Sequence, residues 1–158
     1  MLIDGSCHCG LISFVAEIDP MGVTICHCAD CQILSGAPFR TVVAAPIGQF
    51  KLTGEPRRYS LVQSGKPISQ AFCPDCGTPL FAAAPEGPTF VVIRVGCVTQ
   101  RAQLRPYAQI WEHLAMPWIS DVPLLPNALK QGDASPLPPE PGGTGPSPHP
   151  PSDVPIES

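Results

Sequence analysis

Seven of the eight cysteines fall into three short motifs, and this clustering constrains the fold more than any other feature of the chain. The motifs are Cys7-His8-Cys9-Gly10, Cys26-His27-Cys28-Ala29-Asp30-Cys31 and Cys73-Pro74-Asp75-Cys76-Gly77. Cys97 stands apart from them. In a reducing compartment, clustered cysteines bind metal or carry out redox chemistry more often than they form disulfides. The motifs therefore predict that distant segments of the chain converge on metal.

The first and third motifs predict one closed zinc site. Cys7 and Cys9 supply two thiolates, Cys73 and Cys76 supply two more, and four thiolates complete a tetrahedral site. A glycine after each pair tolerates positive φ and lets backbone N–H groups point at the sulfurs. Such a site would join segments more than about sixty residues apart, which is a structural use of zinc. A thioredoxin-like redox pair and a disulfide between the motifs are the alternatives.

The second motif predicts a zinc site of a different kind. Cys26, Cys28 and Cys31 can surround one ion, and no fourth cysteine lies nearby in sequence. Three protein ligands with an open fourth position are typical of catalytic zinc, which keeps a bound thiol deprotonated or activates water. Two alternatives stay open. One is a structural site closed by Cys97, His27 or His113, and the other is a set of redox-sensing thiols without metal.

The pattern of apolar residues predicts a small all-β domain. Ile12, Phe14, Ala16 and Ile18 alternate with other residues, which indicates a strand over residues 11–18. Further short runs rich in Val, Ile and Phe, separated by Gly and Pro, are typical of strands in such folds. They cover residues 41–45, 49–52, 58–62, 68–72, 80–83 and 90–95. No βαβ alternation is visible.

Residues outside the strands carry four further predictions. Gly36 should cap a short helical turn after Cys31. Pro106 is able to open a helix, because Tyr107, Ile110, Trp111 and Leu114 have helical spacing. Both tryptophans, Trp111 and Trp118, are expected to pack in the core or at its rim. Arg40 is able to meet an anionic substrate, but it is interpreted in the first place as a solvated surface residue, and Cys97 as a buried apolar residue.

Composition sets the boundaries of the domain and narrows the classes of function. Residues 1–126 form the predicted domain, and the Pro-rich residues 127–158 are expected to be a disordered tail, either inert or a ligand for a groove-type domain. A net charge of −4, with nine Lys and Arg and no basic cluster, argues against nucleic-acid binding. No apolar run has the length of a membrane span. The first residues lack a secretion signal, so a cytoplasmic location is expected.

At this point the sequence resembles the glutathione-dependent formaldehyde-activating enzyme (GFA) family, also called the CENP-V family. The matching stretches run in the family's order and cover about residues 4 to 122. They are 5–10, 26–36, Gly54-Glu55 with Tyr59, 72–77, and Gln109-Ile110-Trp111 with Trp118.

The resemblance implies an Mss4-like β fold with few short helices, stapled by a structural zinc at Cys7, Cys9, Cys73 and Cys76. It also implies a second zinc at Cys26, Cys28 and Cys31, linked in the family to glutathione. Family members are grouped as carbon–sulfur lyases, and the founding activity joins glutathione to formaldehyde. The small-molecule partner expected here is a thiol such as glutathione, or its aldehyde adduct.

Some positions depart from the family pattern. Gln32 and Gln70 stand where relatives often carry basic residues, and Cys97 and Val98 stand in a stretch where many relatives carry Leu-Asp. Fewer basic residues near the second zinc weaken the case for a clamp on glutathione carboxylates. The leading hypothesis is a zinc-dependent carbon–sulfur lyase acting on thiol–aldehyde adducts, and the alternative is a non-enzymatic zinc-binding module for structure or interaction.

Overall fold

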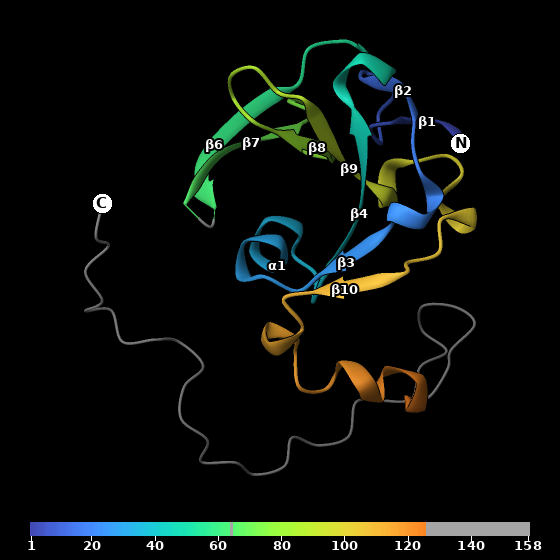
Figure 1. Ribbon diagram of the computed structural model, residues 1–158, viewed down its shortest axis with the longest axis vertical. Coiled ribbons are helices and arrows are strands. Elements are labelled where there is room, and N and C mark those ends of the chain that lie inside the picture. The colour runs from blue at the N-terminus through green and yellow to red at the C-terminus, as the bar shows by residue number, and fades with distance from the viewer. Residues whose placement is uncertain (64, 126–158) are drawn as a thin grey trace. The chain divides into compact units, whose positions relative to one another are not determined.

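A seven-stranded sheet, in the order β10-β3-β4-β9-β8-β7-β6, forms the larger part of the fold (Figure 1). The computed structural model describes residues 1–63 and 65–125. Neighbouring strands in this sheet are antiparallel except for β10 and β3, which are parallel. Its strands are β3 (Thr24–Cys26), β4 (Arg40–Pro46), β6 (Arg57–Gln63), β7 (Lys66–Phe72), β8 (Pro79–Ala83), β9 (Phe90–Arg94) and β10 (Ala108–Ile110).

A second, three-stranded sheet completes the β structure in the order β1-β2-β5. Its strands are β1 (Leu2–Ser6), β2 (Ser13–Glu17) and β5 (Phe50–Thr53). The α-helix is α1 (Ala29–Ser35), which ends at Gly36 in the left-handed conformation expected of a C-cap. Short 3₁₀ turns are η1 (Pro20–Gly22), η2 (Ile47–Gln49), η3 (Val95–Cys97), η4 (Arg101–Gln103), η5 (Glu112–Leu114) and η6 (Ile119–Leu124). The expectation of a mainly β fold with few short helices is confirmed.

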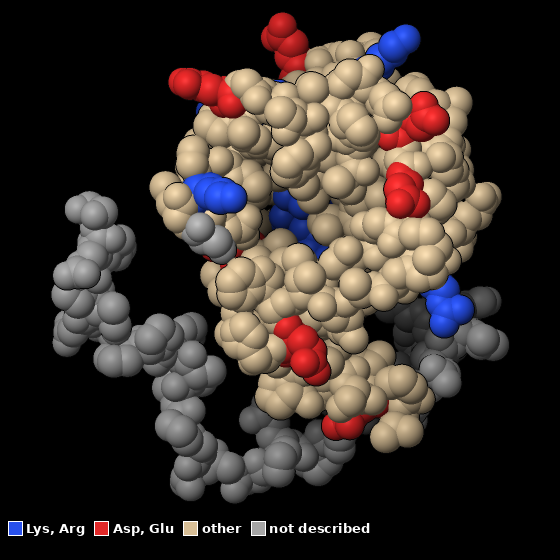
Figure 2. Space-filling model, viewed as in Figure 1, with Lys and Arg blue, Asp and Glu red and all other residues tan. Residues whose placement is uncertain are grey.

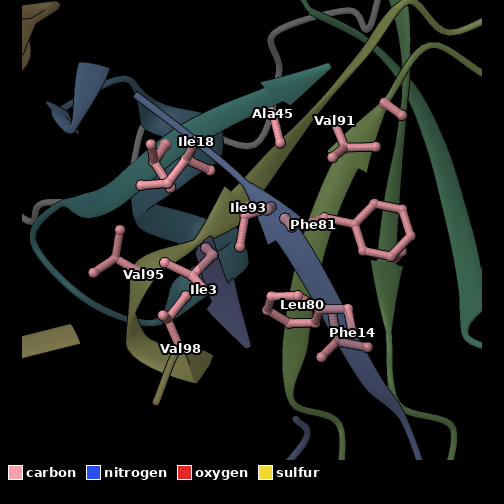
Figure 3. Packing of buried hydrophobic residues seen from close by; sticks show 14 of the residues in the cluster. Ile3, Phe14, Ile18, Ala45, Leu80, Phe81, Val91, Ile93, Val95 and Val98 are labelled. Carbon is pink, nitrogen blue, oxygen red and sulfur yellow. The ribbon is translucent and has the colours of Figure 1, made fainter. Parts of the chain in front are cut away.

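The core is built from alternate residues of both sheets, as the period of two in a strand requires. Ile3 and Phe14 from the small sheet pack with Leu80 and Ile93 from the large one (Figure 3). Each of these side chains is almost fully buried, and burying one stabilises the fold by about 1.5–3 kcal/mol.

The face of the large sheet that points away from the core carries a different set of side chains. In β4, Val43 points into the core while Val42 lies on the opposite face, because successive side chains alternate. Val42 pairs with Arg94, and Cys26 pairs with Arg40, so these four residues share that opposite face. A cysteine, two arginines and a valine are thereby brought together from three strands. In Figure 1 the sheet curves, and α1 lies on its concave side.

Each strand predicted from the sequence overlaps an observed strand, whereas the helix considered from Pro106 is wrong. Residues 108–110 instead form β10, which adds to the edge of β3 in parallel. The four residues with helical spacing are Tyr107, Ile110, Trp111 and Leu114, and each is between 43% and 57% exposed. Because these side chains form no buried apolar stripe, packing would not stabilise a helix here. The segment instead pairs as a strand with the backbone N–H and C=O groups at the edge of β3.

Contacts within the chain divide it into Met1–Ser120 and Asp121–Ser158. The domain boundary predicted after residue 126 stays a prediction, and the proposed tail at 127–158 lies outside the described residues. Within the described part, no helix is long and apolar enough to span a membrane.

Candidate metal centres and an adjoining cavity

The first and third cysteine motifs meet in space, as the sequence predicts. Cys7, Cys9, Cys73 and Cys76, hereafter the four-cysteine cluster, have Sγ atoms that all lie within 4.8 Å of one another. Each pair sits on a tight turn, and the following glycines, Gly10 and Gly77, have φ values of 81° and 70°. Within these turns Gly10 N–H donates to Cys7 O and Gly77 N–H donates to Cys73 O. The glycines thus supply the left-handed backbone that the turns need.

The spacing of the sulfurs fits a tetrahedral metal ion. A metal–sulfur bond of about 2.3 Å places tetrahedral sulfurs about 3.8 Å apart. The Sγ atoms of Cys7 and Cys9 are 3.5 Å apart, and those of Cys9 and Cys73 are 3.7 Å apart. Ile12 N–H also donates to Cys7 Sγ over 3.2 Å, which stabilises negative charge on that sulfur. The cluster could therefore hold a metal ion.

Ionisation of one thiol in this cluster opposes ionisation of the others. Hydrogen bonds from the Thr78 side chain and backbone, and from the Cys9 backbone, lower the pKa of Cys76 to about 5. The backbone N–H of Leu11 lowers the pKa of Cys9, but the neighbouring thiols outweigh it and raise that pKa to about 12. Since like charges this close cannot coexist without compensation, four thiolates require a cation among them.

The second motif also forms a cluster, which contains three sulfurs. Cys26, Cys28 and Cys31, hereafter the three-cysteine cluster, are all buried, and their Sγ atoms lie within 4.8 Å of one another. Cys26 ends β3, Cys28 is the N-cap of α1 and Cys31 lies in its first turn. The Cys26 and Cys28 sulfurs are 3.4 Å apart, again close to the tetrahedral spacing. Burial, followed by the neighbouring cysteines, raises the pKa of the Cys31 thiol.

Among the described residues, no other His, Cys, Asp or Glu joins this cluster. Cys97 lies elsewhere, with its thiol donating to Arg94 O at 3.0 Å. The His27 ring is buried, and its Nε2 is bonded to Gln109 Oε1 at 2.8 Å. The residues considered from sequence as a fourth ligand are therefore absent from the cluster. Three donors around one point leave room for a ligand from outside the protein.

A cavity of about 460 Å³ opens beside the three-cysteine cluster, and all three cysteines line it. Its walls are largely apolar and include Val92 and Trp111, while Arg94 and Lys66 are the charged residues of the lining. Figure 2 shows a hollow near the centre of this face with basic atoms at its floor. A cavity of this size accommodates a small molecule directly against the sulfurs.

Trp111 occupies an unusual backbone conformation at this cavity. Its φ of 57° places it in the left-handed region, and among the described residues no other non-glycine residue has a positive φ. The conformation costs about 1–2 kcal/mol for an L-residue, so the surrounding structure must hold it in place. Its side chain is 45% exposed, so Trp111 lies at the rim of the cavity rather than in the core.

Several residues at the site had no signal in the sequence. Gln63 Nε2 donates to Cys28 Sγ at 3.4 Å and to Asp30 Oδ2 at 3.1 Å, which ties β6 to the three-cysteine cluster. Gln32, noted as a departure from the family, donates to His27 O and Leu114 O and so fixes α1 to the segment after β10. Gln63 and Cys28 are 35 residues apart and Gln32 and Leu114 are 82 residues apart, and such long-range contacts are not revealed by single-sequence patterns.

Arg40 corrects the interpretation made from sequence. It was expected on the surface in solvent, yet it is only 5% exposed, because β4 directs it onto the same face as Cys26. Arg94 is 7% exposed on the same face. Both donate to Oε1 of Gln70, the second departure from the family pattern. Basic groups are thus present near the three-cysteine cluster, but at positions 40 and 94.

Comparison with known proteins agrees with this architecture. The model of the family described as glutathione-dependent formaldehyde-activating enzyme matches residues 2–113. A protein of Schizosaccharomyces pombe, described as an uncharacterized lyase, is 30% identical over 84 residues, covering 53% of this chain. The match spans 59% of that relative's length.

A crystal structure of a Rhodobacter sphaeroides protein has a similar fold, with a TM-score of 0.53 at 17% identity. The superposition covers 67% of this chain and 98% of that protein. At this identity the likeness concerns the fold alone.

Proposed function

Because the chain belongs to the glutathione-dependent formaldehyde-activating enzyme family, we propose that it is a zinc-dependent enzyme of the carbon–sulfur lyase type acting on thiol–aldehyde adducts. The word lyase in the description of the S. pombe relative supports this class of reaction. One observation carries the proposal. The buried three-cysteine cluster has no fourth protein ligand among the described residues, and it opens directly on a cavity.

The two clusters have separate roles in this proposal. The four-cysteine cluster holds a structural zinc, which closes the fold by linking the turn after β1 to the turn after β7. The three-cysteine cluster would hold a second zinc through Cys26, Cys28 and Cys31, which line the cavity and leave room for a ligand bound there. When bound there, zinc supplies a site at which a thiol is kept as its thiolate near neutral pH.

Charge balance favours a thiolate as the ligand from outside the protein. Three thiolates and one Zn²⁺ carry a formal charge of −1, and a fourth thiolate brings this to −2. The buried guanidinium groups of Arg40 and Arg94 lie on the same face; burial lowers the pKa of Arg40, and the nearby cysteines offset part of this lowering. Two positive charges thus face the cluster, which lowers the cost of bringing a thiolate into this interior.

The chain's own residues shape the remaining chemistry. Adduct formation joins the substrate sulfur to the carbonyl carbon, the π electrons of the C=O bond move to oxygen, and that oxygen takes up a proton; cleavage reverses these events. The largely apolar cavity walls provide few competing polar groups, which strengthens electrostatic interactions inside. Lys66 lines the same cavity, and its ammonium group can stabilise negative charge developing on the carbonyl oxygen.

Glutathione, or its aldehyde adduct, is the substrate that the family name suggests. None of the eight cysteines forms a disulfide, which suits a reducing compartment such as the cytoplasm. The alternative function, a zinc module without enzymatic activity, does not require a cavity lined by the three-cysteine cluster.

The test combines metal analysis, thiol binding and turnover on the full chain. Purified protein should hold two zinc ions, bind a small thiol, and form or cleave its formaldehyde adduct. C31S should lose one zinc and the turnover, whereas C97S should keep both, because Cys97 lies outside the cluster. Two zinc ions without thiol binding or turnover of any thiol–aldehyde adduct would refute the enzymatic proposal.

A further inference from the structure

Arg40 and Arg94 are buried with part of their hydrogen-bonding capacity unused. Their exposed fractions are 5% and 7%, and both side chains donate to the same acceptor, Gln70 Oε1. The Nε atom of each has no hydrogen-bond partner among the described residues. A guanidinium group is permanently charged and presents five N–H donors in a planar fork. Two such groups around one amide oxygen therefore leave donors and charge unsatisfied.

The charges around the two arginines do not balance. No carboxylate among the described residues hydrogen-bonds either group. Burial lowers the pKa of Arg40, and the sulfurs of Cys31, Cys26 and Cys28 act against that lowering. With zinc bound, those three thiolates carry a formal charge of −1 against +2 for the arginines. With no substrate thiolate at the cluster, at least one positive charge thus stays uncompensated until another anion arrives, and buried charges normally have a partner.

A second cavity, of about 670 Å³, lies against these arginines. Arg40, Arg94 and Arg101 all line it, and no Asp or Glu does, although Cys7 of the four-cysteine cluster also contributes to the lining. Ser6, Ser35, Thr41, Thr78 and Thr99 line it as well, with the Ser35 hydroxyl donating to Cys31 O and the Thr99 hydroxyl to Asp4 Oδ2. Guanidinium forks and hydroxyls are the donors that bind carboxylate and phosphate oxygens, the forks in a bidentate manner. Arg94 also lines the cavity at the three-cysteine cluster, so the two cavities meet at this residue.

We infer that Arg40 and Arg94 form a binding site for the oxyanion group, carboxylate or phosphate, of a small molecule that occupies this second cavity. The site goes beyond the proposed lyase function, since it requires neither turnover nor a thiol. It also explains why two like charges persist in the interior without an acidic partner: the partner is the ligand.

The test measures oxyanion binding to the zinc-loaded full chain by calorimetry and thermal unfolding. The probes are succinate and inorganic phosphate, with sodium chloride at matched ionic strength as the reference. A ligand at about 100 times its Kd multiplies the folded-to-unfolded ratio about 100-fold, so the unfolding temperature should rise well beyond the chloride reference. Whichever of succinate and phosphate binds more tightly identifies the oxyanion class.

Variants locate the binding. R40Q and R94Q should each weaken oxyanion binding at least about tenfold, since each removes a charge-assisted bidentate contact. R94K, which keeps the charge and loses the fork, should lie between R94Q and the natural protein. R105Q is the matched control, because Arg105 is exposed, and should bind like the natural protein.

Three results would overturn the inference. The first is the absence of saturable binding of either oxyanion to the natural protein. The second is an equal effect of chloride, which would indicate general screening. The third is that R40Q and R94Q each lose one zinc, and that their oxyanion binding falls in proportion to the zinc lost. The arginines would then act only by stabilising the metal-loaded three-cysteine cluster. A protein that binds oxyanions but turns over no thiol adduct would refute the lyase proposal and leave this one standing.

Discussion

Replacing Cys9 by serine should remove more of the zinc-dependent free energy of unfolding than replacing Cys31 does. Both residues contribute one sulfur to a cluster. The four-cysteine cluster, however, links segments far apart in the chain, whereas the three-cysteine cluster links residues around the start of α1. Cys9 is also exposed, so its substitution leaves no buried cavity to confuse the result.

The difference follows from the length of chain that each cluster closes. Cys9 and Cys73 are 64 residues apart, and a cross-link over about that length removes about 4 kcal/mol of unfolded-chain entropy. Cys26 and Cys31 are about five residues apart, and the same relation gives about 2 kcal/mol. The expected difference between C9S and C31S is therefore about 2 kcal/mol in the zinc-dependent part of the stability.

Urea unfolding of each variant, once loaded with zinc and once with a strong chelator, isolates this part by subtraction. Cys31 is buried, so a serine there also lowers the free energy of unfolding by burying a hydroxyl. This effect is present in the chelated samples too, and the subtraction removes it. Metal analysis of the loaded samples should give one zinc in each variant. An equal or larger zinc-dependent loss in C31S would refute the assignment of the four-cysteine cluster as the fold-closing site.

Three further predictions concern packing, the cavity and thiol reactivity. G5A should lower the free energy of unfolding by about 1–3 kcal/mol or more, because its Cβ would lie 2.5 Å from Cys97 O and closer to the Phe14 ring; G48A, with open space around it, should be neutral in the same urea titration. V92F should fill the cavity at the three-cysteine cluster and weaken thiol binding at least about tenfold at unchanged zinc content, as calorimetry and metal analysis would show. Cys97 should react with iodoacetamide about 100-fold more slowly at pH 8 than a thiol of pKa 9.0, because burial raises its pKa to about 11; mass spectrometry of C97S against the natural chain identifies the site.

Sequence patterns predict the local strands and turns of this fold well. They predict contacts between distant segments only where cysteine motifs indicate a shared metal site. Alternation of apolar residues is visible along β2, and Gly36 after α1 is a recognisable cap. β1 escaped notice because Asp4 and Gly5 interrupt its apolar pattern, although Gly5 is needed where the strand approaches Cys97 closely. β10 is too short to show a period of its own.

The arginine pair shows why the rest of the site could not be predicted. Arg40 opens β4 and Arg94 ends β9, and only the pairing of Val42 with Arg94 brings both onto one face. A shift of one residue in this register would turn Arg94 into the core. Register is set by packing of the whole sheet, so neither the burial of the arginines nor the cavity that they line has a signature in the local sequence.

Shared electrostatics should couple the three-cysteine cluster to the arginine pair. Burial raises the pKa of Cys26 and of Cys31, so these thiols are neutral at pH 7 before metal binds. Zinc binding then converts the three-cysteine cluster into a centre of formal charge −1, which compensates part of the positive charge of Arg40 and Arg94. Oxyanion affinity should consequently be lower in the zinc-loaded protein than in the chelated one. Because linkage is reciprocal, the oxyanion must weaken zinc binding by the same factor, and titrating each ligand with and without the other measures both factors. Unequal factors would mean that the two titrations report different sites. Stronger oxyanion binding in the zinc-loaded protein would contradict the prediction, because these charges require zinc to weaken it.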